Sequence, residues 1–114
     1  MADQIPGNRD IAVRLNDALT VAGDSAVRIG RNSSVVVQDN CTLTVGKDLD
    51  VTGKNVTIRG ADSLELVCGA ASILLRKDGT IVIKGRDITI DGSGKVNVKS
   101  SSDVVIKGAK VSQN

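Results

Sequence analysis

The 114-residue chain contains no phenylalanine, tyrosine, tryptophan or histidine. Aromatic side chains usually dominate core packing and stack on exposed bases, so their absence argues against nucleic-acid recognition. The formal net charge is only +2, from 15 basic and 13 acidic residues, which indicates no polyanion-binding surface. We therefore expect no nucleic-acid partner.

The lack of histidine also removes the commonest zinc and iron ligand and the usual base of a catalytic triad. Cys41 and Cys68 are too few and too far apart to form a metal-ligand motif. No carboxylate pair stands out as a separated acid and base. We predict no catalytic residue, no metal site and no cofactor, and we do not expect an enzyme.

Long apolar runs are also missing, because no stretch approaches the roughly 20 residues needed to span a bilayer. The first ten residues, MADQIPGNRD, lack the apolar segment of a signal peptide. We interpret residues 1–10 as a leader or linker, and we expect synthesis in the cytoplasm.

What the sequence does contain is an aliphatic pair with one residue between its members, repeated thirteen times at steps of six to nine residues, most often eight. A fixed period indicates a repeating structural unit. The pairs are Ile11 and Val13, Leu19 and Val21, Val27 and Ile29, Val35 and Val37, Leu43 and Val45, Leu49 and Val51, Val56 and Ile58, Leu64 and Leu66, Ile73 and Leu75, Ile81 and Ile83, Ile88 and Ile90, Val96 and Val98, and Val104 and Ile106.

The residue inside each pair is usually polar, which is the period of two typical of a half-buried strand. Exceptions are Val36, Leu74, Val82 and Val105. Glycine, asparagine and aspartate recur between the pairs and suit corners. Each octad therefore predicts one short strand and one corner, with local distortion at the six-residue step near Lys47 and at the nine-residue step across Val67.

Two all-β arrangements satisfy this repeat. One chain can coil alone and pair each strand with its own next turn, or three chains can wind around a common axis and pair with one another. A narrow three-sided prism has room for aliphatic side chains but little for rings, so the composition favours the trimer. A lone chain would then have no neighbouring strand of its own to pair with.

The predicted trimer core takes both members of eleven of the thirteen pairs. Its residues are Leu19, Val21, Val27, Ile29, Val35, Val37, Leu43, Val45, Val56, Ile58, Leu64, Leu66, Ile73, Leu75, Ile81, Ile83, Ile88, Ile90, Val96, Val98, Val104 and Ile106. Cys41 and Cys68 each lie two residues from a core position, so we expect both to face the interior as small, reduced hydrophobes. The predicted shaft covers residues 11–106, and residues 107–114 form a C-terminal tip segment.

Residues 66–114 resemble the C-terminal β-helix of the valine-glycine repeat protein (VgrG) family, the trimeric spikes of bacterial type VI secretion systems, which are related to contractile phage tail spikes. The most specific segments are CGAASI (68–73), KDGTIVIKG (77–85), GSGKVNVK (92–99) and DVVIKGAKVSQN (103–114). The resemblance implies a trimeric intertwined triple-stranded β-helix, a structural needle that punctures the target envelope.

The resemblance also implies partners and a location. We expect a homotrimer that contacts the target membrane transiently, carries effector cargo, and is joined to a secretion tube by further N-terminal modules of a longer protein. It would leave the bacterial cytoplasm on firing and enter the target cell. A tip protein of the proline-alanine-alanine-arginine (PAAR) repeat class would bind Ile106, Lys107, Gly108, Ala109, Lys110, Val111, Ser112, Gln113 and Asn114.

Two alternatives remain open. A bactofilin-like single-chain β-helix would fold as a monomer and polymerise end to end into filaments. A phage fibre or adhesin shaft would need a terminal binding head, and the chain has no non-repetitive segment large enough to form one.

Overall fold

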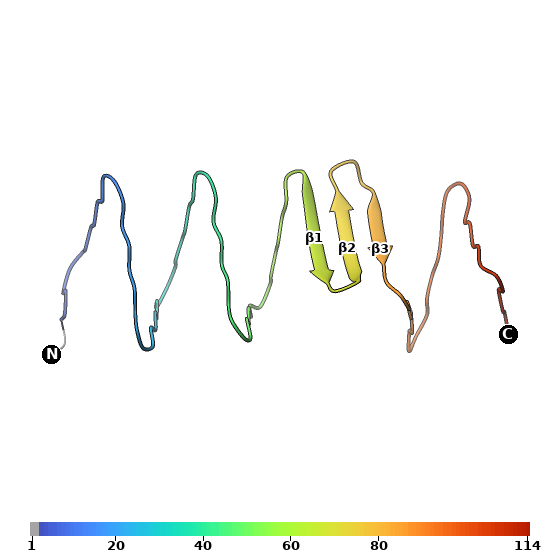
Figure 1. The fold of residues 1–114 in the computed structure, drawn as a ribbon, viewed down its shortest axis with the longest axis horizontal. Helices are drawn as coiled ribbons and strands as arrows, with labels where there is room; N and C mark the ends of the chain where they lie inside the picture. The colour runs from blue at the N-terminus through green and yellow to red at the C-terminus, as the bar shows by residue number, and fades with distance from the viewer. Residues whose placement is uncertain (1–2) are drawn as a thin grey trace. The chain divides into compact units, whose positions relative to one another are not determined.

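The computed structural model describes residues 3–114, which contain three β-strands and no helix (Figure 1). The strands are β1 (Ser63–Cys68), β2 (Ala71–Arg76) and β3 (Ile81–Lys84). The all-β prediction is confirmed. The first two residues of the predicted leader lie outside the described part of the chain.

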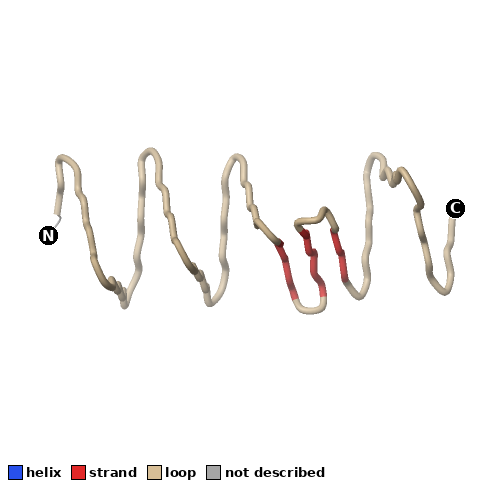
Figure 2. The backbone as a smooth tube through the Cα atoms, turned by 90° about the horizontal axis from the view of Figure 1, so that it is seen from above, coloured by secondary structure: helices blue, strands red, loops and turns tan. Residues whose placement is uncertain are grey.

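The chain divides into two units, Met1–Leu49 and Asp50–Asn114. In the first unit, bends fall at residues 6–7, 14–15, 22–23, 30–31, 38–39 and 46–47. In the second, bends or turns fall at 54–55, 61–62, 69–70, 77–79, 86–87, 93–94, 101–102 and 109. Within each unit, long legs of chain join these corners, and the path winds openly except at the strands (Figure 2).

The corner spacing confirms one corner per octad. It stays at eight residues from 46–47 to 54–55, so the distortion expected near Lys47 does not appear in the corners. The physical reason is that the corners follow bend-forming residues. The early position of Leu49 and Val51 moves the aliphatic pair within its octad without moving the bend.

The three strands form one antiparallel sheet in the order β1-β2-β3. Leu66 is paired with Ile73, and Ile73 is paired in turn with Ile83. The expectation that a lone chain has no neighbouring strand of its own is therefore wrong for residues 63–84. The nine-residue step across Val67 is the place where the chain reverses.

Two glycine turns cause this reversal. Gly69, the first residue of the two-residue loop between β1 and β2, has φ of 55°, and no non-glycine residue in the described chain has positive φ. This pattern is typical of a type II′ hairpin, whose twist matches that of the strands. Gly79, with φ of 93°, ends the Lys77-Asp78-Gly79 loop between β2 and β3.

Backbone hydrogen bonds close the second loop. The Gly79 amide donates to the Arg76 carbonyl at 3.0 Å, and the Arg76 amide donates to the Thr80 carbonyl at 2.9 Å. A three-residue loop that ends in a left-handed glycine is a common hairpin connection. The Lys77 amide also donates to the Asp62 carbonyl at 3.0 Å, which ties the start of β1 to the same loop.

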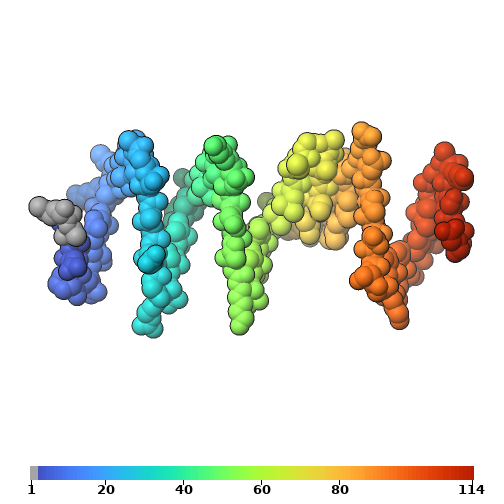
Figure 3. Space-filling model, turned by 90° about the horizontal axis from the view of Figure 1, so that it is seen from below, coloured from blue at the N-terminus to red at the C-terminus, as the bar shows by residue number. Residues whose placement is uncertain are grey.

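No residue of the described chain is buried, so the structure has no core of its own. Only Leu64, Ser72, Leu74 and Val82 are half-buried, and all four belong to the sheet. In the space-filling view the sheet region, coloured yellow to light orange, forms a continuous slab of atoms (Figure 3). Ordered packing within the single chain is therefore confined to β1–β3.

The predicted core residues outside the sheet are all exposed in the single chain, so no interior forms around them within one copy. This group comprises Leu19, Val21, Val27, Ile29, Val35, Val37, Leu43, Val45, Val56, Ile58, Ile88, Ile90, Val96, Val98, Val104 and Ile106. The physical reason is that the corners of these octads lead the chain onward, so no second strand of the same chain covers them. Their burial between chains stays a prediction.

Candidate association surface on the sheet

One face of the β1–β3 sheet carries no charged and no hydrogen-bonding side chain apart from a thiol. Strand alternation and the pairing register place the same eight residues on it, and we call it the aliphatic face. It consists of Leu64, Leu66, Cys68, Ala71, Ile73, Leu75, Ile81 and Ile83.

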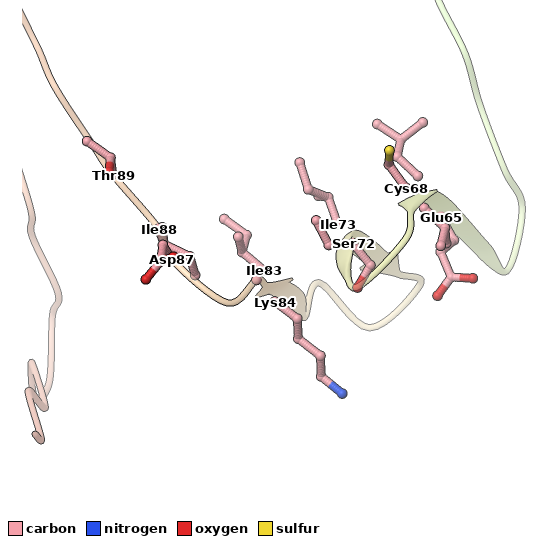
Figure 4. A pocket seen from close by; sticks show the side chains of 13 residues that line it. Glu65, Cys68, Ser72, Ile73, Ile83, Lys84, Asp87, Ile88 and Thr89 are labelled. Atoms are coloured by element: carbon pink, nitrogen blue, oxygen red, sulfur yellow. The ribbon is translucent and has the colours of Figure 1, made fainter.

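The opposite, mixed face carries Ser63, Glu65, Val67, Ser72, Leu74, Arg76, Val82 and Lys84. In the close-up, Cys68, Ile73 and Ile83 project to one side of the sheet, and Glu65 and Lys84 project to the other (Figure 4). The two faces therefore differ in charge, which is the usual distinction between a covered and a solvated face of an antiparallel sheet.

The aliphatic face remains open to solvent in the single chain. Ile73 and Leu75, on the central strand, are 39% and 38% exposed, whereas Leu66 is 55% exposed. The face contributes to an open groove of about 600 Å³, which Ile88 of the following segment also lines. Glu65, Lys84 and Asp87 line the same groove, so it continues from the sheet into the next octad with charged as well as aliphatic side chains.

The structure brings together six of the predicted core residues on the aliphatic face, namely Leu64, Leu66, Ile73, Leu75, Ile81 and Ile83. It does not bring the other sixteen, from Leu19 to Ile58 and from Ile88 to Ile106, into a common cluster with them, apart from Ile88 at the groove. The predicted tip residues, 106–114, contain no strand, and their role also stays a prediction.

Cys68 lies on the aliphatic face, as expected from its position two residues from Leu66. Both cysteines are free and exposed in the single chain. Sequence reasoning noted Leu74 and Val82 only as exceptions to alternation. In the structure Leu74 and Val82 are paired on the mixed face. The alternation of the aliphatic pairs around them could have predicted that both lie on this face.

The loop between β2 and β3 holds an aspartate, Asp78, whose pKa is shifted. The Thr80 backbone amide donates to Asp78 Oδ1 at 3.0 Å. This bond and a second bond from the Thr80 side chain stabilise the carboxylate and lower the pKa of Asp78 below its ordinary value of 3.8. Asp78 therefore acts in the turn, as its sequence position predicts for a corner aspartate.

The residues that the structure describes contain no cluster of three or more histidine, cysteine, aspartate or glutamate side chains suited to a metal ion. Within the same residues, no helix has the length and apolar character required to cross a membrane.

Comparison with known proteins finds a short match to a secretion spike protein. A 36-residue stretch of the chain is 61% identical to the type VI secretion system spike protein VgrG1b of Pseudomonas aeruginosa PAO1. This stretch is 32% of the present chain and 5% of that protein, so the match spans a small part of the relative. Over these residues the chain is related to a VgrG spike protein. No protein-family model matches the chain.

Proposed function

We propose that the chain forms part of the shaft of a type VI secretion spike, in which three copies build a three-sided β-prism. The observation that carries this proposal is the accessible surface of 12952 Å². A compact monomer of 11.8 kDa leaves about 5,900 Å² accessible. A chain that exposes more than twice that area, and buries no described residue, needs other copies to cover it.

The backbone supports the same conclusion. In residues 3–114, every hydrogen bond between backbone groups lies between Asp62 and Lys84. The amides and carbonyls of the remaining described segments have no backbone partner in their own chain. Strands of neighbouring copies, at the usual spacing of about 4.8 Å, would supply those partners.

The identity with VgrG1b supports a role in the type VI machine, and the repeat supports a mechanical one. The rows of aliphatic side chains would hold three chains together along the shaft so that it transmits axial force and punctures the target envelope. Its function is then collective and not catalytic. Residues 106–114 would carry a tip protein of the PAAR-repeat class, and the assembled spike would pass from the bacterial cytoplasm to the target cell.

The direct test is the mass of the particle by size exclusion with light scattering, over a dilution series. The expected mass is three times 11.8 kDa, or 35.4 kDa. Circular dichroism on the same fractions should report β-structure that falls to the contribution of the β1–β3 sheet when dilution dissociates the particle. A folded particle of one chain mass, or filaments without a trimer, would contradict the proposal and favour the single-chain polymer.

A further inference from the structure

We propose that residues 63–84 set the register of the three chains. The β1–β3 sheet forms within each chain, and the trimer closes only when the three sheets stand at the same level, with their aliphatic faces toward one another. This inference rests on the proposed trimeric shaft.

The octad repeat creates the need for such a device. The pairs that start at Leu19, Val27, Val35 and Leu43 are separated by exact steps of eight residues. If one chain slips by one octad, the pairs of this part of the chain still meet other pairs. A slip of one residue would turn the aliphatic side chains to the wrong face, but a slip of a whole octad would not, so these repeats alone do not fix the register.

The sheet breaks this degeneracy because its backbone is already paired within its own chain. Leu64 is paired with Leu75, and Leu75 with Ile81, whereas the neighbouring octads have no such partners. In a slipped trimer, the unpaired legs of one chain would face the paired strands of another. Each amide or carbonyl left buried and unpaired there loses its hydration without a replacement bond, which disfavours the slipped register.

The order of events follows from the loops. Two- and three-residue loops, at Gly69-Ala70 and at residues 77–79, connect the strands. Hairpins with short loops form in about 1–10 μs, whereas association of chains depends on their concentration. Three strands with one apolar face are also about the smallest sheet with independent stability. The sheet is thus available before the chains meet.

The chemistry of the aliphatic face identifies the occupant as further copies of the same chain. When identical faces meet around an axis, each side chain approaches its own copies, so any charge would face a like charge. The aliphatic face carries none, and Glu65, Arg76 and Lys84 all lie on the mixed face. The groove beside this face also reaches Ile88 of the next predicted core octad, where Asp87 lines it too.

Pulse-labelled hydrogen exchange during refolding of the full chain tests the order of events. We expect amides of residues 63–84 to become protected in a phase that does not depend on protein concentration. Light scattering should then show the rise to three chain masses in a later phase that does. If the trimer forms but these amides are protected only in the concentration-dependent phase, the register inference is wrong and the shaft proposal stands. If no trimer forms at any concentration, the shaft proposal fails first.

A matched pair of variants tests the register itself. Gly79→Val places a β-branched residue at φ of 93°, whereas Gly7→Val makes the same change at a glycine without positive φ; a new Cβ meets no atom within 4 Å at either position, so the two variants differ in backbone strain. We expect Gly79→Val to slow trimer formation at least tenfold and Gly7→Val to leave it unchanged. Equal rates for the two variants and the parent chain would overturn the inference.

The registers can be read by spin labelling. A nitroxide at Arg28→Cys, with Cys41→Ala and Cys68→Ala removing the native thiols, should give a single interchain distance in the parent background. With Gly79→Val, additional distances should appear, because one octad of slip moves a label by about one strand spacing, roughly 5 Å, along the axis and onto the next side of the prism. A single unchanged distance in the Gly79→Val trimer would also contradict the inference.

Discussion

Aspartate substitutions at two adjacent residues of β1 test which face of the sheet is covered in the trimer. Leu66 lies on the aliphatic face and Val67 on the mixed face, and the single chain exposes them almost equally, by 55% and 63%. If the chain acts alone, Leu66→Asp and Val67→Asp should have similar small effects. If three aliphatic faces meet, only Leu66→Asp should disrupt the particle.

The magnitude follows from the area that association would cover. Full burial of a leucine is worth about 1.5–3 kcal/mol, so the exposed half of Leu66 still offers roughly 0.8–1.5 kcal/mol per chain. Three copies lose about 2.5–4.5 kcal/mol, which weakens the trimer by about two to three orders of magnitude. Desolvation of three carboxylates at one level adds several kcal/mol per ion. Val67→Asp should cost at most about 0.5 kcal/mol per chain, or about tenfold in total.

The assay is sedimentation equilibrium of both variants and the parent chain across a concentration series. Both variants change the net charge by the same amount, so Val67→Asp controls for general repulsion. An equal loss of trimer in the two variants would refute the assignment of one covered face. An intact Leu66→Asp trimer would refute the interface altogether.

Three further outcomes follow from the same structure. Ile90→Asp, in a predicted core octad beyond the sheet, should dissociate the trimer at micromolar concentration, while Asp91→Asn should leave its sedimentation unchanged; an intact Ile90→Asp trimer would remove Ile90 from the core. The folded-state pKa of Asp78 is lowered, so its contribution to turn stability is present above pH 3.8 and is lost as the pH falls through the lowered value. The Thr80 amide resonance should therefore titrate below pH 3.8, and this titration should vanish in Asp78→Asn; a Thr80 midpoint above 3.8 would contradict the assigned bond. Deletion of residues 107–114 should abolish co-elution with a PAAR-repeat protein and preserve the trimer, and retained co-elution would place the tip site elsewhere.

The period of the aliphatic pairs correctly predicted the corners, whereas only three of the thirteen predicted strands form in the described part of the single chain. Alternation within the pairs that start at Leu64, Ile73 and Ile81 correctly predicted which side chains share a face. It could do so because side-chain direction in a strand depends only on the parity of the position. Alternation does not identify the neighbouring strand, because it is the same whether that strand belongs to the same chain or to another.

The conformation of the turns decides whether neighbouring strands belong to the same chain, and the number of glycines does not predict that conformation. The chain has 12 glycines, yet in the described residues only Gly69 and Gly79 have positive φ. The loops at these two positions have two and three residues, which are the lengths that reverse a strand onto its neighbour. Other corners, such as the bend at Gly30, keep negative φ or an extended backbone and lead the chain onward.

This difference explains how one repeat can combine two kinds of pairing. Where the corner reverses the chain, the strands find partners a few residues away, and order forms without a second molecule. Where the corner leads onward, the strand edges stay open on both sides, and open edges readily recruit other chains. A shaft built only from octads without a partner strand in their own chain would associate in many registers. A shaft built only from hairpins would have its backbone groups already paired and would not associate through them. A single self-paired sheet within a series of open octads supplies a defined level from which the remaining strands can pair in order.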